Sequence, residues 1–191
     1  MSGSTFLSRS DVERDFKYVV DMYTNANRQI SLVTELVVVV TDPAIPIFSP
    51  GLPRDGLWPY FVRNICYFVG RFGVSKEEPT HYVEIAIREA FKAWRTLCSS
   101  DDFVEEASYL YQMGDPFFAR SIVGKGGFVV SCAGRSSKQN YEFARDMLAV
   151  CQQTAFVNKN HSMLLGNDHV IQESPFPSDI DLVIYQGAGA A

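Results

Sequence analysis

Residues 57–74 read LWPYFVRNICYFVGRFGV and residues 82–97 read YVEIAIREAFKAWRTL, and these two apolar segments decide the expected fold of this 191-residue chain. Each is long enough for a helix, and only the polar break SKEEP (75–79) separates them. In the second segment Val83, Ile87 and Trp94 recur at helical spacing, which predicts one buried stripe. We therefore expect a pair of packed helices at the centre of the fold.

The chain before this pair also has a helical pattern. Ser8 or Ser10 is placed to cap a helix whose apolar residues begin at Val12 and recur every three or four positions as far as Val37. The β-branched residues 37–40 favour a strand on propensity, so a short strand is the alternative there. The prolines between residues 43 and 59 then predict an ordered but irregular loop.

The C-terminal half predicts further helices and then a tail. We expect helices at residues 103–113 and 141–156, the second capped by Ser136 or Ser137, with a short turn at 117–123 and room for a short strand at 128–132. Later residues have little helical period, although 182–185 are compatible with one docked strand. The expected architecture is mainly α. A helical-bundle domain with a proline-rich loop covers residues 1–157, and an extended C-terminal tail covers residues 158–191.

Composition and charge exclude some functions. The net charge is −5 and the basic residues are scattered singly, which disfavours nucleic acid as a partner. The four cysteines form no CxxC pair and lie in apolar surroundings, as in a reduced intracellular protein. The longest aliphatic run, residues 36–40, is too short to span a bilayer. We expect a cytoplasmic chain without a transmembrane segment.

One motif points to catalysis. Asp179 and Asp181 alternate in SDIDLV (178–183), as do the magnesium-binding carboxylates on a nucleotidyltransferase strand. Such enzymes place this strand early and need a third carboxylate later, whereas here the sequence ends ten residues after Asp181. The three histidines have no metal-ligand spacing. We therefore expect a non-enzymatic protein, with a magnesium-dependent enzyme as an alternative.

Five short motifs resemble the phycobiliproteins, the globin-like α and β subunits of phycobilisomes. They lie within residues 6–112, and they are Phe6-Leu7-Ser8 with the following Asp11-Val12-Glu13-Arg14, then Asn27-Arg28-Gln29-Ile30, Phe48-Ser49-Pro50-Gly51, Phe61-Val62-Arg63-Asn64 and Ile87-Arg88-Glu89-Ala90-Phe91. This resemblance implies a single globin-like domain that works inside a light-harvesting assembly.

The resemblance also implies a candidate cofactor site. Arg63 matches the arginine that pairs with a bilin propionate, and Asn64 replaces the aspartate that contacts the bilin nitrogens. Phe61 stands where the family has its attachment cysteine, and Cys66 lies five residues further on, which turns it off that helix face. No covalent bilin is therefore expected. A non-covalent bilin held by Arg63, Asn64 and Cys66 stays open.

The expected function is a structural subunit of a phycobilisome-associated assembly. Its partners would be other protein subunits, among them phycobiliproteins, and the assembly would place it at the thylakoid or cell-membrane surface. A content of 13 % aromatic residues suits large contact surfaces. The alternatives are a viral or other self-assembling helical coat subunit and the enzyme that uses Asp179 and Asp181.

Overall fold

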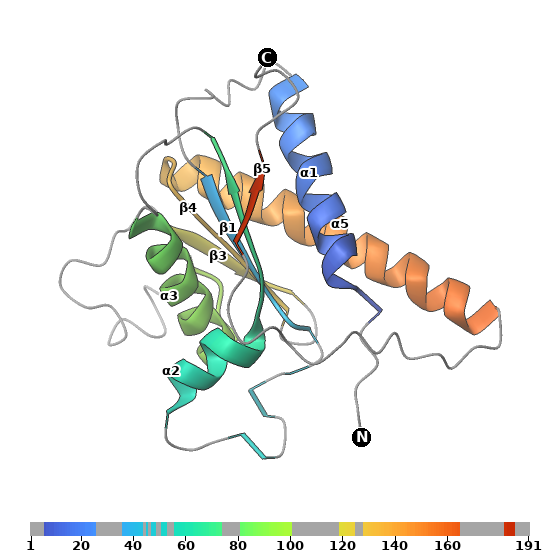
Figure 1. The fold of residues 1–191 in the computed structure, drawn as a ribbon, viewed down its shortest axis with the longest axis horizontal. Helices are drawn as coiled ribbons and strands as arrows, with labels where there is room; N and C mark the ends of the chain where they lie inside the picture. The colour runs from blue at the N-terminus through green and yellow to red at the C-terminus, as the bar shows by residue number, and fades with distance from the viewer. Residues whose placement is uncertain are drawn as a thin grey trace.

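A computed structural model shows a five-stranded sheet with helices packed on both faces (Figure 1). It describes residues 6–25, 36–43, 45, 47–48, 51–52, 56–73, 81–100, 119–124, 128–164 and 182–185. The helices are α1 (Arg9–Asn25), α2 (Leu57–Tyr60), the π-helical turn η1 (Phe61–Ile65), α3 (His81–Thr96) and α5 (Ser137–Leu164). The strands are β1 (Leu36–Thr41), β2 (Cys66–Phe72), β3 (Arg120–Val123), β4 (Val129–Ala133) and β5 (Leu182–Tyr185).

The sheet corrects the expected fold class. Its strand order is β3-β4-β1-β2-β5, and all neighbours are antiparallel except β5, which runs parallel to β2. The prediction of a mainly α, globin-like bundle is therefore wrong, because the described chain is mixed α/β. Of the two decisive segments, residues 82–97 do form a helix, α3, whereas residues 57–74 divide into α2, η1 and β2.

Residues 66–72 form strand β2 instead of the expected helix, and the side chains of this strand are apolar on both faces. Phe68 and Phe72 pack on the side of α1 and α5, and Val69 packs on the side of α3. A strand buried on both faces loses the alternation that identifies strands in a sequence. Gly70 marks a close approach, since a Cβ there would lie 2.7 Å from Cε1 of Phe68 and 2.9 Å from Cε1 of Phe16.

Strand β1 is the centre of the sheet. Val38 and Val40 face the core beneath α1 and α5, while Val37 and Val39 face the core beneath α3. The helical pattern expected to reach Val37 therefore does not hold at its end, and the strand alternative for residues 37–40 is confirmed. Helix α1 ends at Asn25, and β1 begins at Leu36.

Two hydrophobic cores hold the layers together. In the first, the Phe16 ring of α1 lies 5.6 Å from Phe68 of β2 and 6.3 Å from Phe143 of α5, measured between ring centroids. In the second, the Trp94 ring of α3 lies 5.4 Å from Phe61 of η1. Figure 1 shows α3 on one side of the sheet and α1 on the other. Packing between aromatic rings thus joins helices to both faces of the sheet.

The expected helix caps are present. Ser8 and Asp11 bond reciprocally, each side chain accepting from the other's backbone N–H, at 3.1 and 3.0 Å. Ser136 and Gln139 do the same at the start of α5, both at 3.4 Å. Helix α5 runs on to Leu164, so the expected domain boundary at residues 157/158 falls inside it.

The C-terminal half of the chain contains both edge strands of the sheet, β3 and β5, and also β4, which lies next to β3. The expected strand at 128–132 is confirmed as β4, and the docked strand at 182–185 is confirmed as β5. Part of the expected turn at 117–123 is instead strand β3. The helix expected at 103–113 lies outside the described residues, as do residues 44, 46, 49–50 and 53–55 of the proline-rich loop.

Serine hydroxyls cover the outer edge of β3. The Ser100 hydroxyl accepts the N–H of Ser121 at 2.7 Å, and the Ser99 hydroxyl accepts the N–H of Val123 at 3.0 Å. Ser100 also donates to the buried Glu89 carboxylate at 2.7 Å. The outward-facing amides of this strand are thus already bonded. Within the described residues, no helix has the length and apolarity to cross a membrane.

Candidate functional site: a groove between two helices

The structure places the residues of the proposed bilin site on two different elements. Arg63 and Asn64 belong to the π-helical turn, and Cys66 begins strand β2. The Arg63 side chain is exposed, while the Asn64 amide donates to the carbonyl of Tyr60 at 3.0 Å. Burial raises the pKa of the Cys66 thiol to about 12. The three residues therefore do not lie along one regular helix, which the resemblance requires. Asp179 and Asp181 lie outside the described residues.

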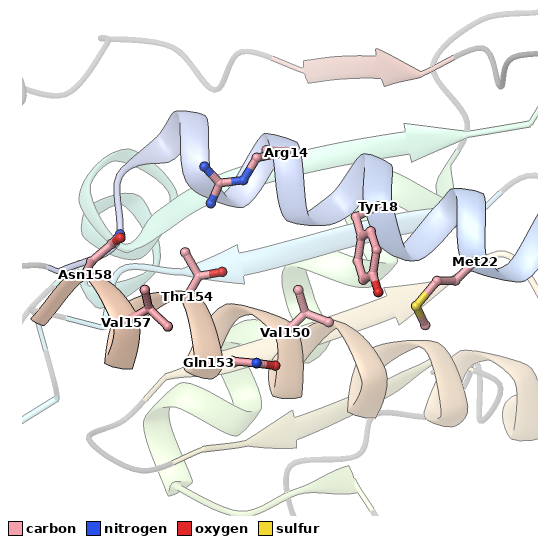
Figure 2. A pocket seen from close by; sticks show the side chains of 8 residues that line it. All are labelled: Arg14, Tyr18, Met22, Val150, Gln153, Thr154, Val157 and Asn158. Carbon is pink, nitrogen blue, oxygen red and sulfur yellow. The ribbon is translucent and has the colours of Figure 1, made fainter. Parts of the chain in front are cut away.

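A groove between α1 and α5 is a hollow that sequence reasoning missed (Figure 2). It has a volume of about 560 Å³. Figure 2 shows side chains from both helices along it. Its lining residues are Arg14, Tyr18 and Met22 from α1, and Val150, Gln153, Thr154, Val157 and Asn158 from α5. Neutral polar groups and apolar groups dominate this lining, and Arg14 is its single charged residue.

Contacts at both ends of the groove hold the two helices antiparallel. At one end, the Tyr23 hydroxyl donates to a carboxylate oxygen of Asp146 at 2.7 Å. At the other, the Asn158 amide donates to Asp11 Oδ2 at 3.1 Å and to the carbonyl of Phe6 at 2.9 Å. These bonds join residues far apart in the sequence, so the groove is a tertiary feature that local pattern cannot reveal.

Charged groups on α1 are paired with one another beside the groove. One Arg14 nitrogen lies 2.9 Å from Asp11, and another lies 3.5 Å from Asp15. Burial alone would raise the pKa of the Asp11 carboxyl, but hydrogen bonds from Ser8 and the charge of Arg14 bring it below its ordinary value. Because Arg14 is already engaged with two carboxylates, it does not give the groove a strong preference for anions.

Asp15 lies buried at the α1–α5 contact, with a side chain that is 5 % exposed. Burial raises the pKa of its carboxyl, against the lowering effects of a hydrogen bond from Thr154 and of Arg14. Within the described residues, Asp15 Oδ2 has no hydrogen-bond partner. An ionised Asp15 therefore weakens the contact between the two helices.

The groove has no activated nucleophile among its neighbours. Burial, reinforced by Asp15, raises the pKa of the Cys151 thiol far above its ordinary value. Burial does the same to the thiol of Cys132. Reactive cysteines have lowered pKa values, so these thiols have the opposite character. No group of three or more metal-ligating side chains occurs within the described part of the chain.

The exposed apolar residues near the groove could have been noticed in the sequence. Tyr18 is 56 % exposed, Phe156 is 65 % exposed and Val157 is 56 % exposed. On a helical projection, Tyr18 lies off the buried stripe of α1, and Phe156 follows the last turn that packs on the sheet. The sequence therefore indicates these exposed apolar residues, but it does not indicate that the two helices pack together. No protein-family model, curated protein or solved structure matches this chain.

Proposed function

We propose that this protein is a non-enzymatic subunit that works by binding other protein chains, and that its docking surface is the groove between α1 and α5. The observation that carries the proposal is the exposure of Tyr18 and Val157, one from each helix, in the lining of one hollow. Single exposed apolar residues are ordinary, but several around one groove are typical of an interaction site.

The energetics favour burial of this surface by a partner. Burying a large apolar side chain contributes about 1.5–3 kcal/mol, and tyrosine is enriched among the residues that dominate binding energy. Tyr18 can also keep its hydroxyl at the rim of an interface while its ring is buried. The groove thus offers two apolar anchors, Tyr18 and Val157, with amide groups between them for orientation.

Of the expected light-harvesting role, only assembly through contacts with other protein chains is part of this proposal. It came from a resemblance that implies a globin-like helical scaffold, and the sheet of β1 to β5 is a different architecture. An assembly role through protein contacts needs no such scaffold and rests on the groove alone. The coat-subunit and magnesium-enzyme alternatives have no described feature that favours them.

Site-specific photo-crosslinking tests the proposal in cells that express the full chain. A photoreactive phenylalanine analogue replaces Tyr18 in the groove, and a matched chain carries it at Lys138, which is exposed at the other end of α5. We expect discrete protein adducts from position 18 that Val157→Glu abolishes, with an unchanged circular dichroism spectrum. Identical adduct patterns from positions 18 and 138 would refute a docking role for the groove.

A further inference from the structure

The second half of α5 is held to the fold by few contacts. Cys151 is the last buried residue of α5 that the structure describes, and the side chains of residues 152–161 are exposed or half-buried. Lys159, Asn160 and His161 are among the exposed ones. We call residues 152–161 the outer segment. Segments with few buried contacts open at a lower free energy than the core of a fold, so the outer segment can separate without unfolding of the whole chain.

The outer segment is bonded to the start of α1. The Asn158 amide donates to Asp11 Oδ2 at 3.1 Å and to the carbonyl of Phe6 at 2.9 Å. The Thr154 side chain bonds to the carboxyl of Asp15. Figure 2 shows Thr154 and Asn158 beside the first half of α1. Both residues also line the groove, so closure of the outer segment on α1 completes one of its walls.

Asp15 has one buried carboxylate oxygen without a bond at this contact. Its side chain is 5 % exposed, and within the described residues Oδ2 has no hydrogen-bond partner. An ionised carboxylate in this position loses the hydration of Oδ2 and gains no bond in return. Separation of the two helices here would hydrate this oxygen. Ionisation of Asp15 therefore favours the open form over the closed one.

The other charged or titratable groups at this contact come from three elements. On α1, Arg14 lies 3.5 Å from Asp15 Oδ1 and favours the ionised form, while the charge of Asp11 disfavours it. On α5, the pKa of the Cys151 thiol is far above its ordinary value, so this thiol stays neutral. Strand β2 packs on the same side through Tyr67, whose hydroxyl donates to a backbone carbonyl at 3.1 Å. Burial outweighs Arg14, and the pKa of the Asp15 carboxyl is raised.

Asp11 responds to pH in the opposite direction. Hydrogen bonds from Ser8 and the charge of Arg14 bring its pKa below the ordinary value, so its contribution to the contact is present above about pH 3.9 and is lost as pH falls through its folded pKa. The contribution of Asp15 is fully present below about pH 3.9 and is lost as pH rises through its raised folded pKa. The contact is therefore strongest at about pH 4 and weaker near neutral pH.

We infer that the outer segment is a pH-dependent latch, which closes on α1 in mild acid, where Asp15 is protonated and Asp11 is ionised, and opens more often near neutral pH, where both are ionised. This inference goes beyond the proposed function, because the segment opens and closes whether or not a partner is bound. The groove has both walls only in the closed form, since Thr154 and Asn158 move away with the outer segment. Mild acid therefore favours the intact groove.

Hydrogen exchange of the full chain, followed residue by residue, measures this opening. We expect the backbone amides of residues 155–161 to have lower protection factors than those of α3 and a weaker dependence on low urea concentrations, because they exchange without global unfolding. Their protection, corrected for the intrinsic exchange rate, should fall at least about fivefold from about pH 4 to about pH 7. This is the change expected for one unmade hydrogen bond at a buried group.

Three variants assign the pH response to Asp15. Asp15→Asn is neutral at every pH and should abolish the fall in protection. Thr154→Val removes a bond to the Asp15 carboxyl and should make the fall larger. Glu13→Gln is the matched control, because Glu13 lies on the same helix and its carboxylate is paired with Lys17 at 2.6 Å. This variant should keep the natural pH response.

Three results would overturn the latch. Equal protection and equal urea dependence for residues 155–161 and α3 would show that the outer segment opens only with the whole chain. Protection that stays constant with pH in the natural chain would exclude control by a carboxyl group. A fall of the same size in Asp15→Asn would exclude Asp15. The first two readings need only the natural chain, so they decide the matter even if a variant fails to fold. No reading requires a partner, so failure of the latch leaves the proposed function as it stands.

Discussion

Replacing Gly70 with valine tests the assignment of β2 as a strand, because a strand and a helix predict opposite signs. In the strand, the new Cβ would lie 2.7 Å from Phe68 and 2.9 Å from Phe16, both closer than carbon atoms approach without a shift. Both rings are fully buried, and Phe16 also contacts Phe143, so neither ring can move without disturbing α5. We therefore expect Gly70→Val to destabilise the fold.

The magnitude follows from two opposing effects. Overpacking by a few carbon atoms costs about 3 kcal/mol, the upper end of the usual range, because the nearest atoms belong to locked rings. Loss of glycine's unfolded-state freedom returns about 1 kcal/mol. The net loss of about 2 kcal/mol should lower the Tm of a chain of this length by roughly 4–8 °C. In a helix, the same substitution would raise the Tm slightly, because valine has a higher helix propensity than glycine.

Thermal unfolding followed by circular dichroism measures the change, and a double-mutant cycle identifies its cause. Phe68→Leu shortens the side chain that meets the new Cβ, so it should recover part of the loss in the Gly70→Val background. A coupling energy of about 0.5–2 kcal/mol between the two positions is expected. A raised Tm, or two strictly additive effects, would refute the packing described for β2.

Three other substitutions test the contacts around the helices and the sheet edge. Tyr23→Phe removes the hydrogen bond to the Asp146 carboxylate and should cost about 1.5–3 kcal/mol in urea unfolding, whereas no change would show that this bond does not stabilise the helix pair. Asp15→Asn should flatten the pH dependence of the urea midpoint. Because the pKa of Asp15 is raised in the folded chain, the stability that this group contributes is fully present below about 3.9 and is lost as pH rises through the folded pKa. The natural chain should therefore lose stability relative to the Asn variant as pH rises above about 3.9, and a difference between the two that does not change with pH would contradict this account. Ser100→Ala removes the acceptor for the Ser121 N–H and should cost about 1–3 kcal/mol, with faster amide exchange at Ser121 as its signature. Unchanged exchange there would count against the serine cover of β3.

Features written in local sequence were predictable, and those made by distant contacts were not. The caps at Ser8 and Ser136 and the helix at 82–97 follow from patterns within a few residues, and the structure confirms them. The same reasoning fails for residues 66–72, because apolar residues on both faces, Phe68 and Phe72 on one and Val69 on the other, give neither a helical nor an alternating period. The groove joins residues more than 120 positions apart. The sequence therefore predicts the helices that form its walls, but it does not predict that these helices pack against each other.

The bonded amides of β3 disfavour docking of another chain at that edge of the sheet. An exposed strand can recruit another chain by offering unpaired N–H groups, and β3 would be such a strand. Its outward amides at Ser121 and Val123 are instead bonded to the hydroxyls of Ser100 and Ser99. A partner strand at this edge would have to displace both bonds before making its own. The groove between α1 and α5 requires no such displacement, because its exposed apolar groups gain contacts without breaking any bond. Binding there therefore costs less than binding at the edge of β3.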